Sequence, residues 1–338
     1  MKRIFSALKK AFEEGRDSVL VTIIASSGST PRGAGARMLV LPESSVGTIG
    51  GGAVEFAALQ AARRLLSLRE SGFHNYDLSP GDVENLGMVC GGRVTVCFQF
   101  ISSADTHMRK LAEKALELLS GNEDAWTITD ITGGKVNGMG IYTASEGLWG
   151  LDIDGVEKLA SGRAYPVEQS GRTLYCEPLI RAGRVYIFGA GHISRELVPA
   201  LARVDFRCVV YDDMKDFLTR ELFPEAEDLI CGDFGDISAH IAITEKDYIV
   251  IVTRGHKYDY IVQAQALRTP TRYIGVIGSR KKIAFVTEKL KNDGFTDKDI
   301  SRITSPIGLK IGAETPAEIA VSIAAQLIAV RANYPLEQ

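Results

Sequence analysis

Hydrophobic positions in the first 120 residues recur with two different periods, and each period predicts a type of element. Helical spacing of apolar residues over 2–14 predicts an amphipathic helix, and a continuous apolar run over 18–25 predicts a buried strand. Further strands are expected over 37–41, 73–78 and 93–101, with helices over 53–70 and 104–120. The last of these strands alternates apolar with more polar residues, which indicates one buried face. We therefore predict an N-terminal α/β domain over residues 1–120.

Residues 121–182 have a different pattern. Short alternating segments lie between turn pairs such as Gly133-Gly134 and Asn137-Gly138. Such a pattern is typical of antiparallel hairpins. We predict a β-rich connector or appendage in this region.

Strand-like runs alternate with helical ones from residue 183 to residue 338. Strands are expected over 185–188, 208–211, 228–231, 248–252 and 273–277, and helices over 192–204, 258–266, 280–292 and 316–331. Alternation of this kind predicts a doubly wound parallel sheet with helices on both faces. The C-terminal part is therefore predicted to be a Rossmann-type nucleotide-binding domain.

Composition adds limits to this picture. A chain of 338 residues with 45% apolar residues is long enough for two domain cores. Its 39 Lys and Arg nearly balance its 42 Asp and Glu, and no segment combines basic with aromatic residues, so binding to nucleic acid has little support. No apolar run approaches the roughly 20 residues of a membrane span. The charged N-terminus lacks a secretory apolar core, so we expect a cytoplasmic protein with no membrane association.

The five cysteines include no Cys-x-x-Cys pair, which argues against a disulfide framework and against a thiolate zinc site. Cys97, Cys208 and Cys231 lie in predicted strands or at strand ends and are interpreted as core residues, whereas Cys176 has no clear assignment. Cys90 precedes Gly91 and Gly92 in a predicted loop. Cysteine is usually a small buried hydrophobe. In such a permissive turn, however, a thiolate could carry sulfur or contact a soft metal centre.

A glycine-rich turn opens the predicted Rossmann domain. Gly189 and Gly191 follow a strand and begin a helix, as in the G-x-G-x-x-G fingerprint, but Ser194 replaces the third glycine. The first two glycines allow a phosphate to approach backbone N–H groups, and Asp212, at the end of the next strand, is placed to bind ribose hydroxyls. The alternative is a Rossmann domain that has lost or changed its ligand.

Three further polar residues follow strands at the point where the strand order should reverse. His192 lies beyond the first strand, His256 beyond the fourth and Ser279 beyond the fifth. The two imidazoles could hold a metal or protonate an anionic ligand, or each could cap backbone groups or stack on a base. Two histidines with Asp259 are too few and too loosely spaced for a protein-bound metal, so none is predicted.

The N-terminal loops offer further anion-binding features. Arg32 follows a loop of small hydroxyl residues, and its guanidinium can bind phosphate through two hydrogen bonds. Gly50, Gly51 and Gly52 present backbone N–H groups at a predicted helix N-terminus. Glu55, in the first turn, could bind a ligand or simply complement the helix dipole.

Several of these motifs together resemble a known family. Residues 27–32, 47–52 with Glu55, and 90–92 resemble the N-terminal XdhC/CoxI domain of the xanthine dehydrogenase accessory factors. Residues 189–192, 254–256, 278–281 and 305–320 resemble the Rossmann domain of the same family, and the motifs occur in the same order. Only the β-rich middle is unmatched.

The resemblance implies a protein that binds molybdenum cofactor, either molybdopterin or a nucleotide form of it. It also implies support of cofactor sulfuration and insertion into an apo molybdenum hydroxylase, with a cysteine desulfurase as a partner. We expect a homodimer that acts as a cofactor-binding chaperone rather than as a turnover enzyme, without catalytic residues of its own. The rival is an NAD(P)-dependent oxidoreductase, although Ser194 puts NAD(P) in doubt. A third interpretation is a regulatory protein that only senses a nucleotide.

Overall fold

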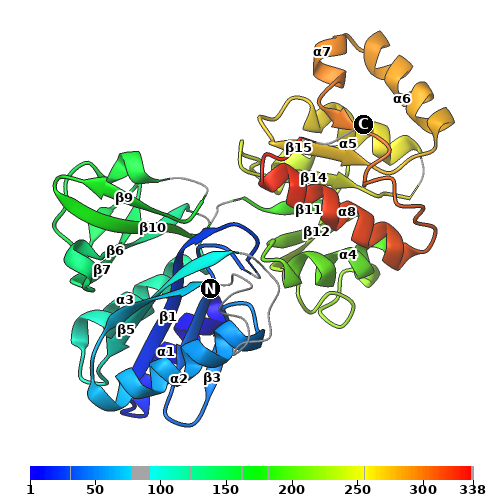
Figure 1. Cartoon of the computed structure of the whole chain (residues 1–338). Helices are drawn as coiled ribbons and strands as arrows, with labels where there is room; N and C mark the ends of the chain where they lie inside the picture. Colours follow the sequence, from blue (N-terminus) through cyan, green and yellow to red (C-terminus); the bar gives the residue numbers. More distant parts are fainter. Residues whose placement is uncertain are drawn as a thin grey trace. The chain divides into compact units, whose positions relative to one another are not determined.

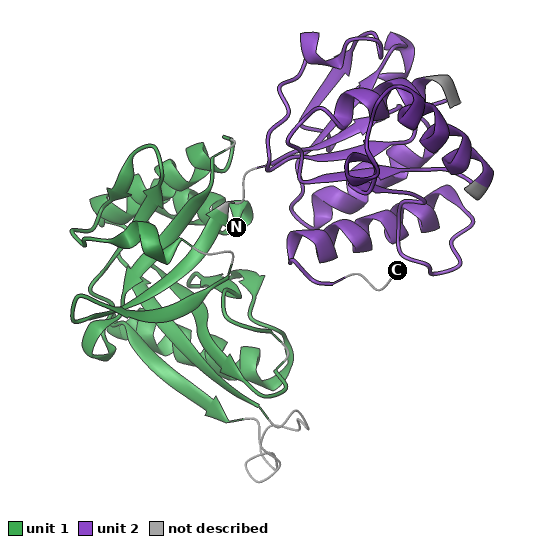
Figure 2. Cartoon of the chain, turned by 90° about the horizontal axis from the view of Figure 1, so that it is seen from above, with its two compact units in different colours: residues 1–181 green, residues 182–338 purple. Residues whose placement is uncertain are grey.

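The structure, a computed structural model, describes residues 1–30, 32–77, 92–121, 123–160, 163–180, 183–254 and 256–335. The chain divides into two compact units, residues 1–181 (unit 1) and residues 182–338 (unit 2) (Figure 2). Two antiparallel sheets form unit 1, and a parallel sheet forms unit 2, so the predicted α/β class is confirmed. Among the helices of the described ranges, none has the length and apolar character needed to cross a bilayer.

The first sheet of unit 1 (sheet A) has the strand order β3-β2-β1-β5-β4. Its strands are β1 (Ser18–Ser27), β2 (Arg37–Val40), β3 (Ser45–Thr48), β4 (Gly72–Asp77) and β5 (Arg93–Ile101). Helices α1 (Lys2–Glu13) and α3 (Thr106–Leu118) share a core with Leu20, whereas α2 (Gly52–Leu68) shares another with Val19 and Val21. Because successive residues of β1 face opposite cores, the strand is buried and mostly apolar from Val19 to Ile24.

Residues 125–180 form a second antiparallel sheet (sheet B) with the order β8-β7-β6-β10-β9. Its strands are β6 (Ala125–Asp130), β7 (Gly138–Thr143), β8 (Gly147–Trp149), β9 (Tyr165–Gln169) and β10 (Arg172–Ile180). The predicted hairpins are therefore present. Ala125, Met139, Ile141 and Leu179 of this sheet lie in the same core as α1 and α3, so sheet B is packed into unit 1.

Unit 2 is a six-stranded parallel sheet with the order β13-β12-β11-β14-β15-β16. Its elements are β11 (Val185–Phe188), α4 (His192–Arg203), β12 (Cys208–Asp212), β13 (Asp228–Cys231), β14 (Tyr248–Ile251), α5 (His256–Ala266), β15 (Tyr273–Val276), α6 (Arg280–Asn292), α7 (Asp297–Ile300), β16 (Ile303–Thr304) and α8 (Pro316–Arg331) (Figure 1). Helices α4 and α8 cover one face, and α5 and α6 cover the other. The doubly wound Rossmann prediction is confirmed.

The strand order reverses at β11, which lies between β12 and β14. All of these neighbours are parallel, so their carboxyl ends lie at one edge of the sheet. The loops after β11 and β14 are therefore adjacent, as the sequence predicted. In folds of this class the ligand crevice lies at this reversal.

Two interpretations were incomplete or wrong. Strand β3 was not predicted, because its residues are mostly exposed and carry no apolar signal. Cys97, Cys176 and Cys208 are buried, but Cys231 is exposed. Its interpretation as a core residue was wrong because β13 is the edge strand of its sheet and Cys231 is its last residue.

Candidate functional site

The turn after β11 is built around Gly189. Its φ of +111° is in the region that favours glycine, and a Cβ atom there would lie 2.6 Å from the carbonyl oxygen of Val252. Glycine is required because the backbone that leaves β14 passes directly beside the turn. Ser194, at the position of the third fingerprint glycine, is fully buried and donates its hydroxyl proton to the Gly189 carbonyl. The third glycine of the fingerprint usually allows the helix to pack closely on the strand. Here Ser194 instead stabilises the turn through a hydrogen bond.

The other end of the turn is open. Gly191 is the N-cap of α4 and makes no side-chain capping hydrogen bond. Nothing lies within 4 Å of the position that a Cβ atom would take on this residue. The exposed His192 follows as the first residue of the helix. The first turn of α4 is therefore accessible to an anion.

Asp212 is engaged within the protein. Its carboxylate accepts hydrogen bonds from the backbone amides of Ala190 (2.7 Å) and Met214 (3.0 Å), and it is 2% exposed. Arg254 forms an ion pair with it at 3.1 Å. These contacts join the glycine turn to the ends of β12 and β14. Ribose hydroxyls would have to compete with them for the carboxylate.

Arg254 was not predicted as a site residue on its own. Its guanidinium also pairs with Asp213 at 2.7 Å and lies over the Phe217 ring, 5.4 Å from the ring centroid. The side chain remains 47% exposed at the end of β14. Its position beside the strand-order reversal was the signal that could have identified it.

The remaining predicted residues of unit 2 have more local surroundings. Ser279 is the N-cap of α6 and accepts a hydrogen bond from the Lys282 amide at 3.4 Å. Asp259 is fully buried, accepts from the Thr253 hydroxyl at 2.5 Å and pairs with Lys282. The His256 side chain lies outside the described residues, so its pairing with His192 stays a prediction. No cluster of three or more His, Cys, Asp or Glu side chains suited to a metal occurs in the described part of the chain.

In unit 1, the Glu55 carboxylate binds backbone amides of the turn that contains Gly50, Gly51 and Gly52. Glu55 accepts hydrogen bonds from the amides of Ile49 (2.9 Å) and Gly51 (3.0 Å) and from the Thr48 hydroxyl (2.5 Å). Partial burial raises the pKa of Glu55, but these hydrogen bonds outweigh it and hold the pKa below its ordinary value. The carboxylate therefore serves the helix N-terminus. The Gly50 amide also has a partner, because it donates to the Thr48 hydroxyl at 3.1 Å, so a phosphate would have to displace these internal contacts.

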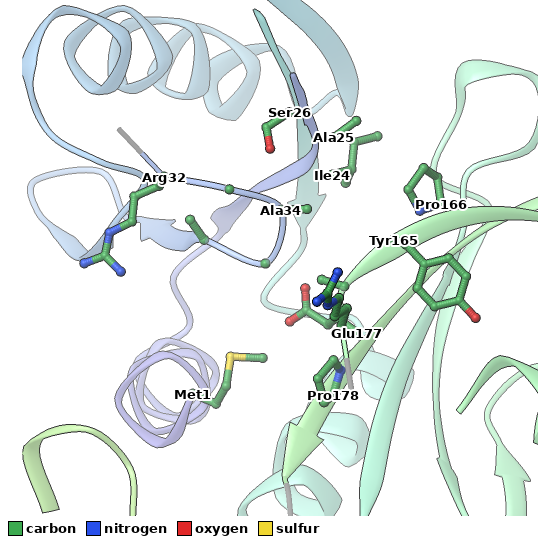
Figure 3. Close-up of a pocket in the computed structure, with 15 residues that line it drawn as sticks. Met1, Ile24, Ala25, Ser26, Arg32, Ala34, Tyr165, Pro166, Glu177 and Pro178 are labelled. Atoms are coloured by element: carbon green, nitrogen blue, oxygen red, sulfur yellow. The ribbon is translucent and has the colours of Figure 1, made fainter. Parts of the chain in front are cut away.

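A cleft in unit 1 contains Arg32. It has a volume of about 730 Å³ and lies between the end of β1, the loop before β2, and strands β9 and β10. Figure 3 shows Arg32 and Ser26 on one side of this cleft and Tyr165 and Glu177 on the other. We call it the Arg32 cleft. Its volume is in the range of known small-molecule sites.

Part of the predicted cysteine loop can be placed. Cys90 and Gly91 lie outside the described residues. A Cβ atom on Gly92 would lie 2.4 Å from the Ser29 carbonyl and 2.8 Å from the Ser27 carbonyl. Gly92 therefore lies directly against the loop that leads from Ser26 toward Arg32.

Comparisons with known proteins agree with these motifs. A model described as the XdhC and CoxI family matches residues 11–77, and a model described as the XdhC Rossmann domain matches residues 185–327. A Bacillus subtilis (strain 168) protein named as a probable xanthine dehydrogenase subunit is 26% identical over 338 residues, which cover 98% of each protein. "Uncharacterized protein YqeB" of Escherichia coli (strain K12) is 25% identical over 334 residues, or 98% of this chain; the chain spans only 47% of that protein.

A solved structure supports the fold. The crystal structure of a protein described as a xanthine dehydrogenase from Bacillus halodurans matches with a TM-score of 0.81 and 24% identity, covering 98% of this chain and 96% of that one. The two family domains occur here in the order that the motifs predicted. The chain therefore belongs to the XdhC/CoxI family, with its N-terminal domain followed by its Rossmann domain.

Proposed function

We propose that this protein is an accessory factor for a molybdenum hydroxylase of the xanthine dehydrogenase type. It would bind molybdenum cofactor as cargo, support its sulfuration and insert it into the apo hydroxylase. The Bacillus subtilis relative, whose name places it in a xanthine dehydrogenase, matches along almost its whole length. The structural observation that carries the proposal is the Arg32 cleft, a cavity of ligand size in the unit that contains the XdhC and CoxI match.

The cargo has groups that suit these surroundings. Molybdenum cofactor contains a pterin and a phosphate, and a guanidinium such as that of Arg32 binds phosphate well. The open first turn of α4, in unit 2, is a separate feature to which a phosphate can bind. The molybdenum centre supplies the site at which a sulfur atom is to be installed. Cys90, from the family resemblance, is the proposed soft ligand or sulfur carrier, with a cysteine desulfurase as the source.

The direct test is analysis of the purified protein. Full-length protein isolated from molybdate-supplied cells that make the cofactor should contain bound pterin and molybdenum. Addition of that protein to the apo hydroxylase should restore hydroxylase activity. If neither pterin nor molybdenum copurifies from a host that makes active hydroxylase, the cargo role is wrong.

The role of Cys90 needs its own variant. Cys90→Ala should bind the pterin but activate the hydroxylase poorly, at no cost in thermal stability. Cys231→Ala is the matched control, because Cys231 is exposed to solvent but lies at the edge of unit 2. Full activation by Cys90→Ala would remove the thiol from the proposal.

A second candidate is an NAD(P)-dependent oxidoreductase. The strand order of unit 2, with β11 between β12 and β14, is that of dinucleotide-binding domains. Against it, the Asp212 carboxylate is already bound to Ala190 and Arg254. Titration with NADH and NADPH separates the two candidates, because the oxidoreductase requires tight binding of at least one of them.

A further inference from the structure

A further cavity lies in unit 2, at the carboxyl ends of β15 and β16. It has a volume of about 150 Å³, and residues of α5, α6 and α7 complete its wall. We call it the Gln263 cavity, after the α5 residue that lines it. Folds of this class bind their ligands at the carboxyl ends of the parallel strands. The cavity is therefore in a part of the fold that is suited to a small molecule.

Gln263 has a buried side chain that lacks a partner. The residue is 5% exposed, and its carboxamide forms no hydrogen bond with any of the described residues. By contrast, the carboxamide of Gln265, on the same helix, accepts from the Ile237 amide and donates to the Phe234 carbonyl. The unpartnered polar atoms that the described fold seals from solvent belong to other residues, so a molecule in the cavity can reach the Gln263 carboxamide. Because buried polar groups normally have partners, this amide calls for one from outside the chain.

Lys282 brings an ammonium group to the same cavity. It lies in the first turn of α6, its side chain is 14% exposed, and it forms an ion pair with the fully buried Asp259. The other Asp259 oxygen accepts from the Thr253 hydroxyl at 2.5 Å. An ammonium group has three N–H donors, and the pair with Asp259 uses one of them. Lys282 can therefore donate to a ligand, although the pair as a whole has no net charge.

Most of the remaining wall is apolar. It includes side chains from the sheet and from two helices, namely Val276, Ile283, Val286, Ile300 and Ile303. In general, an apolar cavity of about 150 Å³ holds a molecule of the size of benzene. The Gln263 cavity therefore has room for one planar ring between aliphatic side chains.

We propose that the Gln263 cavity binds a small, uncharged, planar ring that carries an amide, with C=O and N–H on one edge. The Gln263 carboxamide pairs with this edge through two hydrogen bonds, because it has an acceptor and a donor side by side. Lys282 donates to the carbonyl of the ligand. The ligand is uncharged because Asp259 already balances the Lys282 charge, and burial of an unpaired charge is costly. This inference goes beyond the proposed function and does not depend on it.

Binding of defined small molecules to the full-length protein tests this inference, with affinities measured by ligand-observed NMR titration. Benzamide carries its amide outside the ring, and acetophenone is its control because it has the same shape without the N–H. In 2-pyridone the amide is part of the ring, and 4-pyridone is its control because N–H and C=O lie on opposite sides. In at least one pair the amide should bind at least about tenfold more tightly than its control, which leaves the buried Gln263 carboxamide unsatisfied.

The two pairs distinguish the two sources of an amide edge. Tighter binding of benzamide identifies an aromatic carboxamide as the ligand class, whereas tighter binding of 2-pyridone identifies a ring with an internal amide. Benzoate tests the charge and should bind more weakly than benzamide. Equal binding within both pairs, tighter binding of benzoate, or no binding of any of these molecules overturns the inference.

One variant assigns the amide contact. Gln263→Leu should remove the preference for the amide over its control, whereas Gln60→Leu, at an exposed position of α2, should keep it. Gln263→Leu should also unfold at the same or a higher temperature than the wild type, because an apolar side chain replaces a buried amide without a partner. A retained preference, or a marked fall in the unfolding temperature, contradicts the assignment and indicates a structural role for Gln263.

A second variant tests the cavity itself. Thr287→Met fills it from α6 and leaves both Gln263 and the Asp259–Lys282 pair in place. It should abolish binding of the amide, whereas Glu288→Met, at the exposed neighbouring position, should not. Retained affinity of Thr287→Met would overturn the inference. The assay contains neither molybdenum cofactor nor hydroxylase, so its outcome is separate from that of the proposed function.

Discussion

Gly189 lies where the glycine turn meets the backbone that follows β14. A Cβ atom would approach the Val252 carbonyl oxygen to 2.6 Å, and the φ of +111° is itself unfavourable for other residues. We expect Gly189→Ala to lower the free energy of unfolding by about 2–4 kcal/mol. Gly191→Ala is the matched control, because that position has φ −79° and open space, and should cost about 1 kcal/mol or less. Urea unfolding followed by circular dichroism measures both, and equal effects would contradict this interpretation of the turn.

Glu55 gives a prediction for the dependence of stability on pH. Its pKa in the folded protein is lower than the ordinary value of 4.5, so its ionised form stabilises the fold above that pH and loses this effect as the pH falls through the folded pKa. We expect Glu55→Ala to lower the free energy of unfolding by about 1–2 kcal/mol at pH 7, because the amides of Ile49 and Gly51 lose their acceptor.

The difference between the wild type and Glu55→Ala should shrink as the pH falls from 4.5 through the lower pKa of Glu55 in the folded protein, as measured by urea unfolding at each pH. Glu43→Ala, at an exposed position in the same unit, should show little difference at either pH. The loss of unfolding free energy in Glu55→Ala could instead be the same at neutral and at acid pH. That result would show that the charge of the carboxylate does not contribute to stability.

Single residues show where prediction from the sequence reaches its limit. The positions of Asp212 and Glu55 relative to their strand and helix were predictable from spacing, but their hydrogen-bond partners were not. Both carboxylates bind backbone amides of the glycine turns beside them. A sequence places an acid near a turn, whereas only the folded backbone decides whether the acid binds the turn or a ligand.

Elements were more predictable than contacts. The buried parallel strands of unit 2 are continuous apolar runs, and five of the six strands were predicted with the four long helices. The short elements α7 and β16 were not predicted. Strand β3 was not predicted because its residues are mostly exposed and show no apolar pattern. The Arg32 cleft was not predicted for another reason: its lining residues Ser26 and Tyr165 lie on different sheets, and no local pattern in the sequence links them.

Helix α8 provides a test at the scale of an element. It begins with a capping box, in which the Thr315 hydroxyl accepts from the Glu318 amide at 3.3 Å and the Glu318 carboxylate accepts from the Thr315 amide at 2.9 Å. Because α8 packs in the core with α4, loss of the cap should weaken unit 2. We expect Thr315→Ala to cost about 1 kcal/mol in urea unfolding. Ser67→Ala, whose hydroxyl only bonds a carbonyl of its own helix, should stay within about 0.5 kcal/mol of the wild type.

At the scale of the whole molecule, the relation between sheets A and B decides how the chain can be divided. The sequence separates residues 1–120 from 121–182 by pattern, yet the structure groups both in unit 1. Ala125, Met139, Ile141 and Leu179 of sheet B complete the core that contains α1 and α3. A change in hydrophobic pattern therefore marks a change of element type and need not mark a domain boundary.

This shared core predicts the outcome of truncation. A fragment of residues 1–120 loses those four core side chains, and it also leaves the buried Arg37 guanidinium without Glu177. Removal of one partner of a buried ion pair alone costs about 3–5 kcal/mol, a large part of the stability of a typical domain. We expect this fragment to lack a cooperative thermal transition and dispersed amide resonances, whereas residues 1–181 should show both. Residues 183–338, which keep both cores of unit 2, serve as the folded control. A cooperatively folded 1–120 fragment would show that sheet B is dispensable and that Arg37 can be buried without its partner.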